Sequence, residues 1–265
     1  MNNISIAKES IEITRAGGYS LGHRQVILPK LDLSAVEVCS PEEGEELIRK
    51  LRPEGEMCRI TVTAEDSFQA ARRFENPFVM NFANAHKAGG GFLFGANAQE
   101  EALCRCSTLY ASISSEAAKE MYHYNNTHLS SVESDYMLYS PSVCVFRDEK
   151  CQLLEEPFTA SVMTVPAPNR HGAALFASEG TVREAMMRRI RIMLAKAAEH
   201  GHKNLILGAW GCGAFGNKPE NVSWYFKKIL TDEGYGRMFG DVCFAIYGSV
   251  NGKNYRAFCR TFNIE

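Results

Sequence analysis

From Met57 onward, strand-like and helix-like segments alternate along the chain, and this alternation constrains the fold more than any other feature. Short runs rich in β-branched and aromatic residues, bounded by proline and polar residues, predict strands. Between them lie segments whose apolar residues recur every three to four positions, which is typical of one face of a helix. Chains of this kind build a central, largely parallel sheet covered by helices. The sequence therefore predicts an α/β fold.

The expected elements follow one another without an internal repeat. A long polar connection is expected at 121–136, between a helix and the strand that follows it. Strands are expected at 57–66, 77–85, 141–146, 158–168, 203–210 and 241–248, and helices at 67–74, 99–113, 181–200 and 219–230.

The first 55 residues differ from the rest of the chain. They contain short mixed segments, a polar turn region at 14–23, and an acidic run at 42–46 that leads into a short helix-like stretch. We expect residues 1–55 to form an accessory region packed on the core, and residues 56–265 to form the main domain.

Composition and charge exclude several classes of protein. Of the 265 residues, 45% are hydrophobic and 23% charged, which is ordinary for a globular chain. No apolar run approaches the roughly 20 residues needed to cross a bilayer, and the polar start lacks the build of a signal peptide, so we expect a cytoplasmic protein without membrane contact. The net charge of −2 and the pI near 6.4 argue against a broad basic surface for nucleic acid.

Nine cysteines are scattered along the chain, an odd number that does not suit a disulfide framework. Their spacings match no common zinc pattern, and Cys104-Arg105-Cys106 is C-x-C rather than the redox motif C-x-x-C. We expect reduced thiols and no bound metal.

Two glycine-rich loops each lie between an expected strand and an expected helix. The first is Gly89 to Gly91, and the second runs from Gly211 to Gly216. Glycine lets backbone approach a ligand closely, and successive amides before a helix form an anion site without charged side chains. Neither loop has the Walker A or the dinucleotide-fold order. One such loop is equally typical of a tight turn, but two in one sheet favour a diphosphate site.

The segments around these loops add two further expectations. Asn217 is expected to cap the helix at 219–230, with Glu220 three residues later. Glu100 and Glu101 stand in the first turn of another expected helix, where adjacent acids commonly just complement the helix dipole. Their place after three glycines favours chemistry instead, because a neighbouring carboxylate, partial burial and a bound diphosphate would each raise the pKa of an acid that must donate a proton. Successive helix positions diverge by about 100°, which favours different roles for the two acids.

Several motifs together resemble a known family. NFANAHKAGGG is similar to the macrodomain signature, and GGGFLFGANAQEE resembles that of the poly(ADP-ribose) glycohydrolase branch of macrodomains. EALCRCSTLY, YSPSVCVFRD, VPAPN and GCGAFGN then follow as in the microbial type of that enzyme. The resemblance covers roughly residues 57–250. It implies a three-layer α/β/α macrodomain with a mixed, mostly parallel sheet, and an N-terminal extension before it.

The resemblance also implies roles for individual residues. Glu101 matches the catalytic glutamate, Glu100 the acid that holds the distal ribose hydroxyls, and Asn84 the asparagine at that ribose, although asparagine alone is typical of a turn. Asp66 stands roughly where macrodomains bind the adenine amino group, with Glu65 as a competing choice. The two diphosphate loops correspond to Gly89, Gly90 and Gly91, and to Gly211, Cys212, Gly213, Ala214, Phe215 and Gly216, with Phe215 beside the ribose.

The implied activity is hydrolysis of the O-glycosidic ribose–ribose bond of poly(ADP-ribose), without a cofactor. The implied partners are ADP-ribose and its polymer on modified macromolecules, and we expect a monomer. Two alternatives stay open. The same loops would serve a hydrolase of mono-ADP-ribose on protein or nucleic acid, because only the leaving group differs. A module that binds ADP-ribose without cleaving it would need the loops and Asp66 but not both acids.

Overall fold

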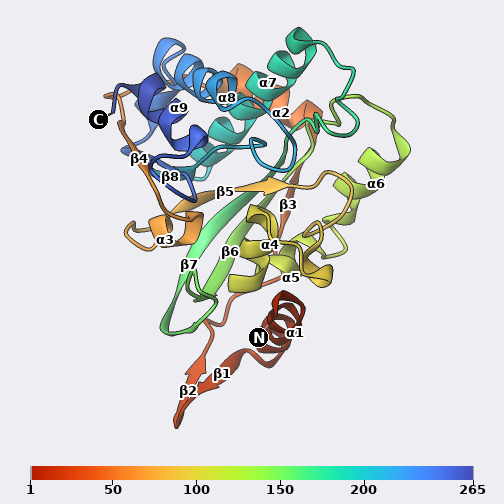
Figure 1. Ribbon diagram of the computed structural model, residues 1–265, viewed down its shortest axis with the longest axis vertical. Coiled ribbons are helices and arrows are strands. Elements are labelled where there is room, and N and C mark those ends of the chain that lie inside the picture. Colours follow the sequence, from red (N-terminus) through yellow and green to blue (C-terminus); the bar gives the residue numbers. More distant parts are fainter. Residues whose placement is uncertain (1, 265) are drawn as a thin grey trace.

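The computed structural model describes residues 2–264, and its centre is a seven-stranded sheet (Figure 1). The strand order is β3-β6-β7-β5-β8-β9-β4, and β1 and β2 form a separate hairpin. In chain order the strands are β1 (Gly18–Leu21), β2 (Arg24–Ile27), β3 (Glu37–Cys39), β4 (Arg59–Thr63), β5 (Phe78–Ala83), β6 (Met137–Arg147), β7 (Leu153–Pro166), β8 (Asn204–Leu207) and β9 (Asp241–Ala245).

The sheet is mixed and mostly parallel. Strands β7, β5, β8, β9 and β4 pair in parallel, whereas β6 pairs antiparallel with both β7 and β3. Parallel neighbours need crossover connections, which the intervening helices supply. The predicted fold class is confirmed by this topology and by the structural matches reported below.

Helices cover both faces of the sheet (Figure 1). One hydrophobic core packs the sheet against α7, α8 and α9, and a second packs the other face against α3, α4, α5 and α6. No helix within residues 2–264 has the length and apolar content to cross a membrane. The α-helices are α1 (Asn3–Ala16), α2 (Pro41–Lys50), α3 (Ser67–Ala71), α4 (Gln99–Cys106), α5 (Leu109–Ile113), α6 (Lys119–Thr127), α7 (Glu179–Glu199), α8 (Pro219–Lys227) and α9 (Lys253–Phe262); shorter turns are η1 (Phe92–Phe94), η2 (Lys228–Asp232) and η3 (Tyr235–Met238).

Strand β5 shows how the two cores are divided. Phe78 and Met80 point into the core under α7 and α8, while Val79 between them points into the core under α3 and α4. Successive side chains of a strand face opposite sides of the sheet. A strand that is covered on both faces has a continuous apolar sequence, and β5 begins with one, Phe-Val-Met. The strand therefore fixes the position of the glycine loop that follows it.

Two expected segments differ in the structure. The helix expected at 99–113 is divided, because Ser107 forms an isolated β-bridge with Val145 and the amide of Thr108 donates to the carbonyl of Cys144. The polar connection expected at 121–136 contains most of α6, which buries Met121 and other side chains of one face. Polar residues on the solvent side of that short helix hid its periodicity.

The N-terminal residues contact the core in several places. Helix α1 packs on α4 and η1, and α2 packs on α7, where Gly44 lies against Ile192. Strand β3 extends the main sheet at one edge, beside β6. The hairpin of β1 and β2 projects away from the sheet at the lower end of Figure 1. A domain boundary near residue 55 stays a prediction.

Candidate active site

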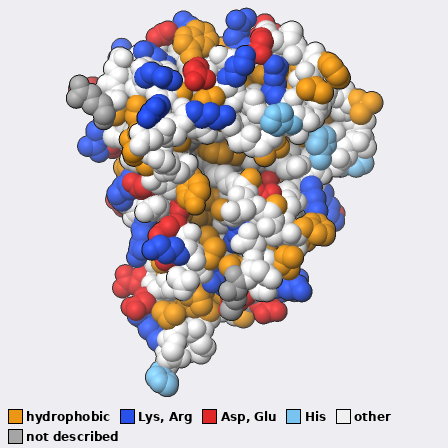
Figure 2. Space-filling model, viewed as in Figure 1, with side chains coloured by type: hydrophobic (Ala, Val, Ile, Leu, Met, Phe, Trp, Pro, Cys, Tyr) orange, Lys and Arg blue, Asp and Glu red, His pale blue; other side chains and the backbone are white. Residues whose placement is uncertain are grey.

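The candidate site lies where β5 and β8 end, at the carboxyl edge of the parallel strands. Open α/β sheets bind ligands at this edge, because the loops there lead into helix N-termini. The first glycine loop follows β5 and leads through η1 to α4, and the second connects β8 to α8. Figure 2 shows the face hollowed across its middle, with Lys and Arg side chains gathered along the upper side. The predicted loops therefore lie at one edge of the sheet.

Glu101 joins the first glycine loop to the start of α4. One carboxylate oxygen, Oε1, accepts a hydrogen bond from the amide of Gly91 at 2.9 Å, and Oε2 accepts one from the amide of Ala98 at 3.0 Å. The side chain is only 7% exposed. Both oxygens of this acid are thus held by backbone donors at fixed positions.

Gly90 explains why bare backbone is needed beside the acids. Its φ is +54°, in the left-handed region that side chains with a Cβ rarely adopt. A Cβ there would lie 2.6 Å from Oε1 of Glu101 and 3.3 Å from Oε2 of Glu100. The loop therefore passes directly over both carboxylates, and only glycine leaves room for them.

The fold shifts the pKa of the Glu100 carboxyl. It is 3% exposed, and this burial raises the pKa of its carboxyl to about 8. Hydrogen bonds from the Asn84 amide, at 2.8 Å, and the Asn81 side chain, at 3.4 Å, oppose the rise in pKa, and the charge of Glu101 adds to it. The carbonyl oxygen of the Asn81 amide is buried without a partner, so a protonated Glu100 has an acceptor close by. The elevated carboxyl pKa thus falls on Glu100.

The side chain of Asn84 shapes a turn in the structure. Its side-chain oxygen accepts hydrogen bonds from the amides of His86, at 2.8 Å, and Lys87, at 3.0 Å, which shapes the start of the glycine loop. Its backbone amide holds Glu100. The predicted contact between Asn84 and a ribose stays a prediction.

Gln99 is a residue of the site that the sequence did not single out. Its side-chain oxygen accepts from the amide of Phe82 at 2.8 Å, and its NH₂ group donates to the carbonyl of Met80 at 2.8 Å and to the hydroxyl of Ser67 at 3.0 Å. It ties the first turn of α4 to β5 and to α3. The only signal in the sequence was its place directly before the two acids.

The second glycine loop divides into buried and open residues. Cys212 is buried, and burial raises the pKa of its thiol to about 12, so that side chain belongs to the core. Gly213 and Ala214 are exposed, and a Cβ at Gly213 would meet nothing within 4 Å. Phe215 is half-buried and packs against the core. The open tip of this loop is therefore the part that a ligand can reach.

The segment after β7 braces this loop. The amide of Arg170 donates to the carbonyl of Phe215 at 2.9 Å, and Nδ1 of His171 lies 2.9 Å from the carbonyl oxygen of Ala214. A Cβ on Gly216 would lie 2.5 Å from Nε2 of His171. His171 is thus a second site residue missed from sequence, since nothing in its local pattern marks it.

Asn217 does not cap α8 as predicted. Lys218 occupies the N-cap position without a side-chain cap. The NH₂ group of Asn217 instead donates to the carbonyls of Pro168, at 2.9 Å, and Gly211, at 3.2 Å. The side-chain amide of Asn217 is buried beneath the loop, and buried polar groups need hydrogen-bond partners. The two carbonyl groups of the loop provide these partners, so the side chain does not cap the helix.

Asp66 lies between β4 and α3. It caps α3, with Oδ1 accepting from the amide of Gln69 at 2.9 Å, and burial raises its pKa. The competing acid, Glu65, forms an ion pair with Arg73. Because the Glu65 carboxylate is already paired, Asp66 is the better candidate for the predicted contact with an adenine amino group.

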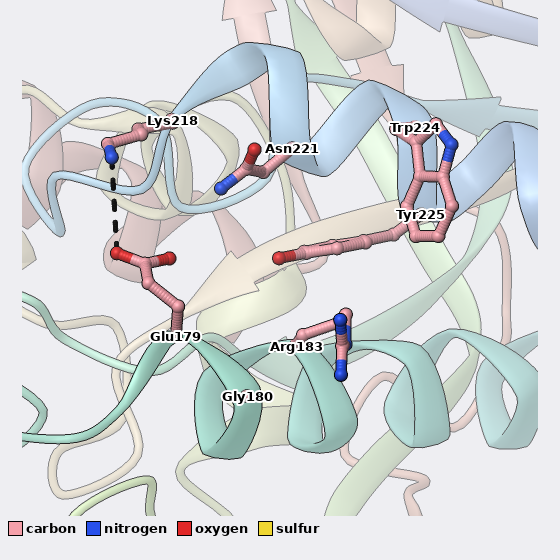
Figure 3. Close-up of a pocket in the computed structure, with 7 residues that line it drawn as sticks. All are labelled: Glu179, Gly180, Arg183, Lys218, Asn221, Trp224 and Tyr225. Carbon is pink, nitrogen blue, oxygen red and sulfur yellow. Dashed lines mark ion pairs between the residues drawn. The ribbon is translucent and has the colours of Figure 1, made fainter.

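A separate groove lies between α7 and α8 (Figure 3). Its volume is about 310 Å³, and Lys218 and Glu179 face each other across it at 4.0 Å. None of the predicted site residues lines it. Within residues 2–264, His, Cys, Asp and Glu side chains nowhere gather in threes as a metal site would require.

Comparisons with known proteins define the class and then the family. The seven-stranded sheet with helices on both faces is that of a macrodomain-like fold. The family model "Microbial-type PARG, catalytic domain" matches residues 7–148, and the chain belongs to this family. The match begins inside the predicted accessory region. A comparison with curated protein sequences finds no match.

Solved structures of bacterial enzymes match almost the whole chain. Poly(ADP-ribose) glycohydrolase from Thermomonospora curvata is 37% identical, covers 98% of this chain and 99% of its own, and superposes with a TM-score of 0.90. The structure of the same enzyme with the inhibitor ADP-HPD is 36% identical, covers 97% of this chain and 98% of its own, and superposes with a TM-score of 0.89. The enzyme from Deinococcus radiodurans in complex with ADP-ribose is 38% identical, covers 89% of this chain and 98% of its own, and has a TM-score of 0.82.

Proposed function

We propose that this protein hydrolyses the O-glycosidic ribose–ribose bond of poly(ADP-ribose) and releases ADP-ribose. Family membership supports the reaction class. One observation carries the assignment to this site: Gly90 passes so close to Glu101 and Glu100 that a Cβ would collide with the first acid. A loop suited to a diphosphate is thereby joined to two carboxyl groups, as cleavage beside an ADP-ribose unit requires.

Glu101 is the proposed general acid and base. Cleavage of a glycosidic bond passes through an oxocarbenium-like transition state, in which the leaving oxygen takes a proton. Glu101 protonates the departing ribose oxygen, and the resulting carboxylate then takes a proton from the water that attacks the anomeric carbon. The backbone donors at Gly91 and Ala98 fix the carboxyl group for both steps.

Glu100 is the proposed anchor of the distal ribose. With a pKa near 8 its carboxyl is protonated at neutral pH, so it can donate a hydrogen bond to a sugar hydroxyl as well as accept one. A neutral carboxyl is a poor nucleophile, which argues against a covalent glycosyl-enzyme. The NH₂ group of Asn84 supplies a further contact to the same sugar. Positioning of this kind removes much of the entropic barrier to cleavage.

The diphosphate is held by the two loops rather than by net charge. We infer that the first loop, Gly89 to Gly91, and the open tip of the second loop at Gly213 and Ala214 lie against the diphosphate, with Phe215 beside the ribose and Asp66 at the adenine. All nine cysteines are free, which supports a reducing, cytoplasmic compartment.

The test replaces Glu101→Gln and measures ADP-ribose release from polymer. Loss of a general acid/base should lower turnover by about 10²–10⁴-fold. Glu184→Gln, on the exposed face of α7, is the matched control and should keep wild-type turnover. ADP-ribose binding by calorimetry should persist in both variants. Near wild-type turnover of the folded Glu101 variant would refute the role of this acid.

The same assay separates the alternative functions. Release from mono-modified protein but not from polymer would favour the mono-ADP-ribosyl hydrolase. Tight ADP-ribose binding by the wild-type protein with no product from either substrate would favour the binding module. Preferred release from polymer, abolished by Glu101→Gln, supports the proposal.

A further inference from the structure

The groove between α7 and α8 adjoins the second glycine loop (Figure 3). Lys218 stands at the start of α8, just after this loop ends at Gly216. Arg170 joins the loop to α7, because its amide donates to the carbonyl of Phe215 at 2.9 Å and its guanidinium donates to the carboxylate of Glu179 at 2.6 Å. The groove thus lies beside the loop but shares no lining residue with it.

A buried tyrosine presents an unpartnered hydroxyl to the groove. Tyr225 is 5% exposed, and no group in the part of the chain that the structure describes hydrogen-bonds to its hydroxyl. Figure 3 shows this hydroxyl pointing into the space between the two helices. Burial and the charge of Glu179 raise the pKa of the phenol, so the hydroxyl keeps its proton and can donate. Because polar groups of buried residues need partners, the hydroxyl indicates a ligand in the groove.

The charges around the groove favour an anion. Within residues 2–264, the exposed Arg183 forms no ion pair, and the exposed Lys218 approaches only Glu179, at 4.0 Å. The Glu179 carboxylate is paired more closely with Arg170, at 2.6 Å. Helix α8 also begins without a side-chain cap, so the positive end of its dipole stays open to an anion. The groove therefore has two cations to offer a ligand, although the whole chain has a net charge of −2.

Trp224 adds an aromatic surface beside these cations. Its side chain is 47% exposed, and Tyr225 packs edge-on against it, with ring centroids 5.9 Å apart and ring planes at 75°. An exposed indole next to cationic side chains can stack a nucleic-acid base. Asn221 lies on the same face of α8, and its side-chain amide can both donate and accept hydrogen bonds. The volume of about 310 Å³ suits one nucleotide better than a length of polypeptide.

We propose that this groove binds a further ADP-ribose unit of the polymer, beyond the unit held by the glycohydrolase site. The adenine stacks on Trp224, the diphosphate lies against Arg183 and Lys218, and the Tyr225 hydroxyl and Asn221 amide hydrogen-bond to the unit. The inference rests on the proposed function, because only a polymer brings further units of this kind. The groove gives long polymer a second point of attachment, and it takes no part in bond cleavage.

The fluorescence of Trp224 tests the groove directly, with ADP as the probe. The chain has two tryptophans, and the other, Trp210, is buried. ADP should quench part of the emission of the wild-type protein, and this part should be missing in Trp224→Phe. Any quenching that persists in Trp224→Phe comes from Trp210. Equal quenching in the two proteins would overturn the proposal.

Gly180→Leu tests the same groove by filling it. Gly180 lines the groove within α7, and a Cβ there would meet only Oγ of Ser178, at 3.6 Å. Leucine is a better helix former than glycine, so the helix should be kept while the groove is blocked. ADP should quench Trp224 at concentrations at least about fivefold higher in this variant, since a base stack on an aromatic ring contributes that much or more. Lys30→Ala, at an exposed lysine just after β2 at the other end of the molecule in Figure 1, should bind ADP as the wild type does.

Kinetics with two substrates separate the groove from the glycohydrolase site. Trp224→Ala and Arg183→Ala should each raise the KM for long polymer about fivefold and leave kcat unchanged. A small O-glycoside of ADP-ribose has no further unit, so its KM should be the same in both variants, the Lys30→Ala control and the wild type. An unchanged polymer KM in both variants would overturn the groove and leave the proposed function intact.

Two further outcomes are decisive. If the wild type cleaves neither substrate, the proposed function is refuted, while the fluorescence still decides whether the groove binds ADP. If polyadenylate quenches Trp224 at lower concentration than poly(ADP-ribose) does, the assignment of the groove to the polymer is overturned.

Discussion

At the scale of single residues, the site depends on the absence of a Cβ in glycine. Gly90 has a left-handed backbone and no Cβ, and both features are needed for Glu101 and Glu100 to lie beneath the loop. The sequence indicated glycines close to acids but not which glycine faces which carboxylate. That assignment depends on the φ angles of the loop, which three identical residues in a row do not reveal.

Gly90→Ala should inactivate the enzyme more than it destabilises the fold. The new Cβ would lie 2.6 Å from Oε1 of Glu101 and would displace the acid, for an expected loss of turnover of about 10²-fold or more, since a 1 Å misplacement can cost that much. Gly201→Ala is the matched control, because Gly201 also has a positive φ, +70°, but has nothing within 4 Å of its Cβ position. Equal activity in the two variants, measured by ADP-ribose release, would contradict the clash.

Glu100→Gln should remove a pH dependence of stability. The folded pKa of about 8 lies above the ordinary 4.5, so the stabilisation is complete below pH 4.5 and is lost as the pH rises towards 8. At 1.36 kcal/mol per pKa unit the limit is about 4 to 5 kcal/mol, and relaxation should reduce the loss to about 2 kcal/mol. Urea unfolding at pH 5 and pH 8.5 should show this loss for wild type and Glu184→Gln but not for Glu100→Gln. If Glu100→Gln loses as much unfolding free energy between pH 5 and pH 8.5 as the wild type does, the raised pKa of Glu100 is refuted.

At the scale of elements, α4 organises the site. Its first turn carries both acids, and Gln99 before them joins β5 to α3 through three hydrogen bonds. The alternation of strands and helices was predictable because each element has its own apolar periodicity. The break at Ser107 was not, because a bridge to Val145 depends on a strand far along the chain. Asn81 and His171 were missed for the same reason, since their partners are set by tertiary packing.

Gln99→Ala should weaken both the fold and catalysis. It leaves the amide of Phe82 and the carbonyl of Met80 without their partner, at a cost of about 2–3 kcal/mol in the free energy of unfolding. Turnover should fall as well, because the turn that holds the acids loses its anchor. Gln69→Ala, on the exposed side of α3, is the control and should change the unfolding free energy by less than about 0.5 kcal/mol. A Gln99 variant as stable and active as this control would show that the anchor is dispensable.

At the scale of the whole molecule, the site is assembled from segments far apart in sequence around one sheet with helices on both faces. The glycine loops after β5 and β8 come together because both strands end at one edge of the sheet. The resemblance to the family implied a role for each site residue, and the fold brings the two loops that carry these residues to the same edge of the sheet. The N-terminal residues belong to this assembly through α1 on α4, α2 on α7 and β3 on β6.

Removing residues 1–55 tests whether that region is accessory. Its deletion exposes the edge of β6 and removes buried apolar side chains worth roughly 2 kcal/mol each, together about 10 kcal/mol, which is comparable to the whole stability of a domain. We expect residues 56–265 alone to lack a cooperative thermal transition and glycohydrolase activity. Adding the fragment 1–55 in trans should restore part of both. A truncated chain with wild-type melting and turnover would instead support the domain boundary near residue 55. The side chains that carry this estimate are Ile6, Ile13, Tyr19, Val26 and Leu28.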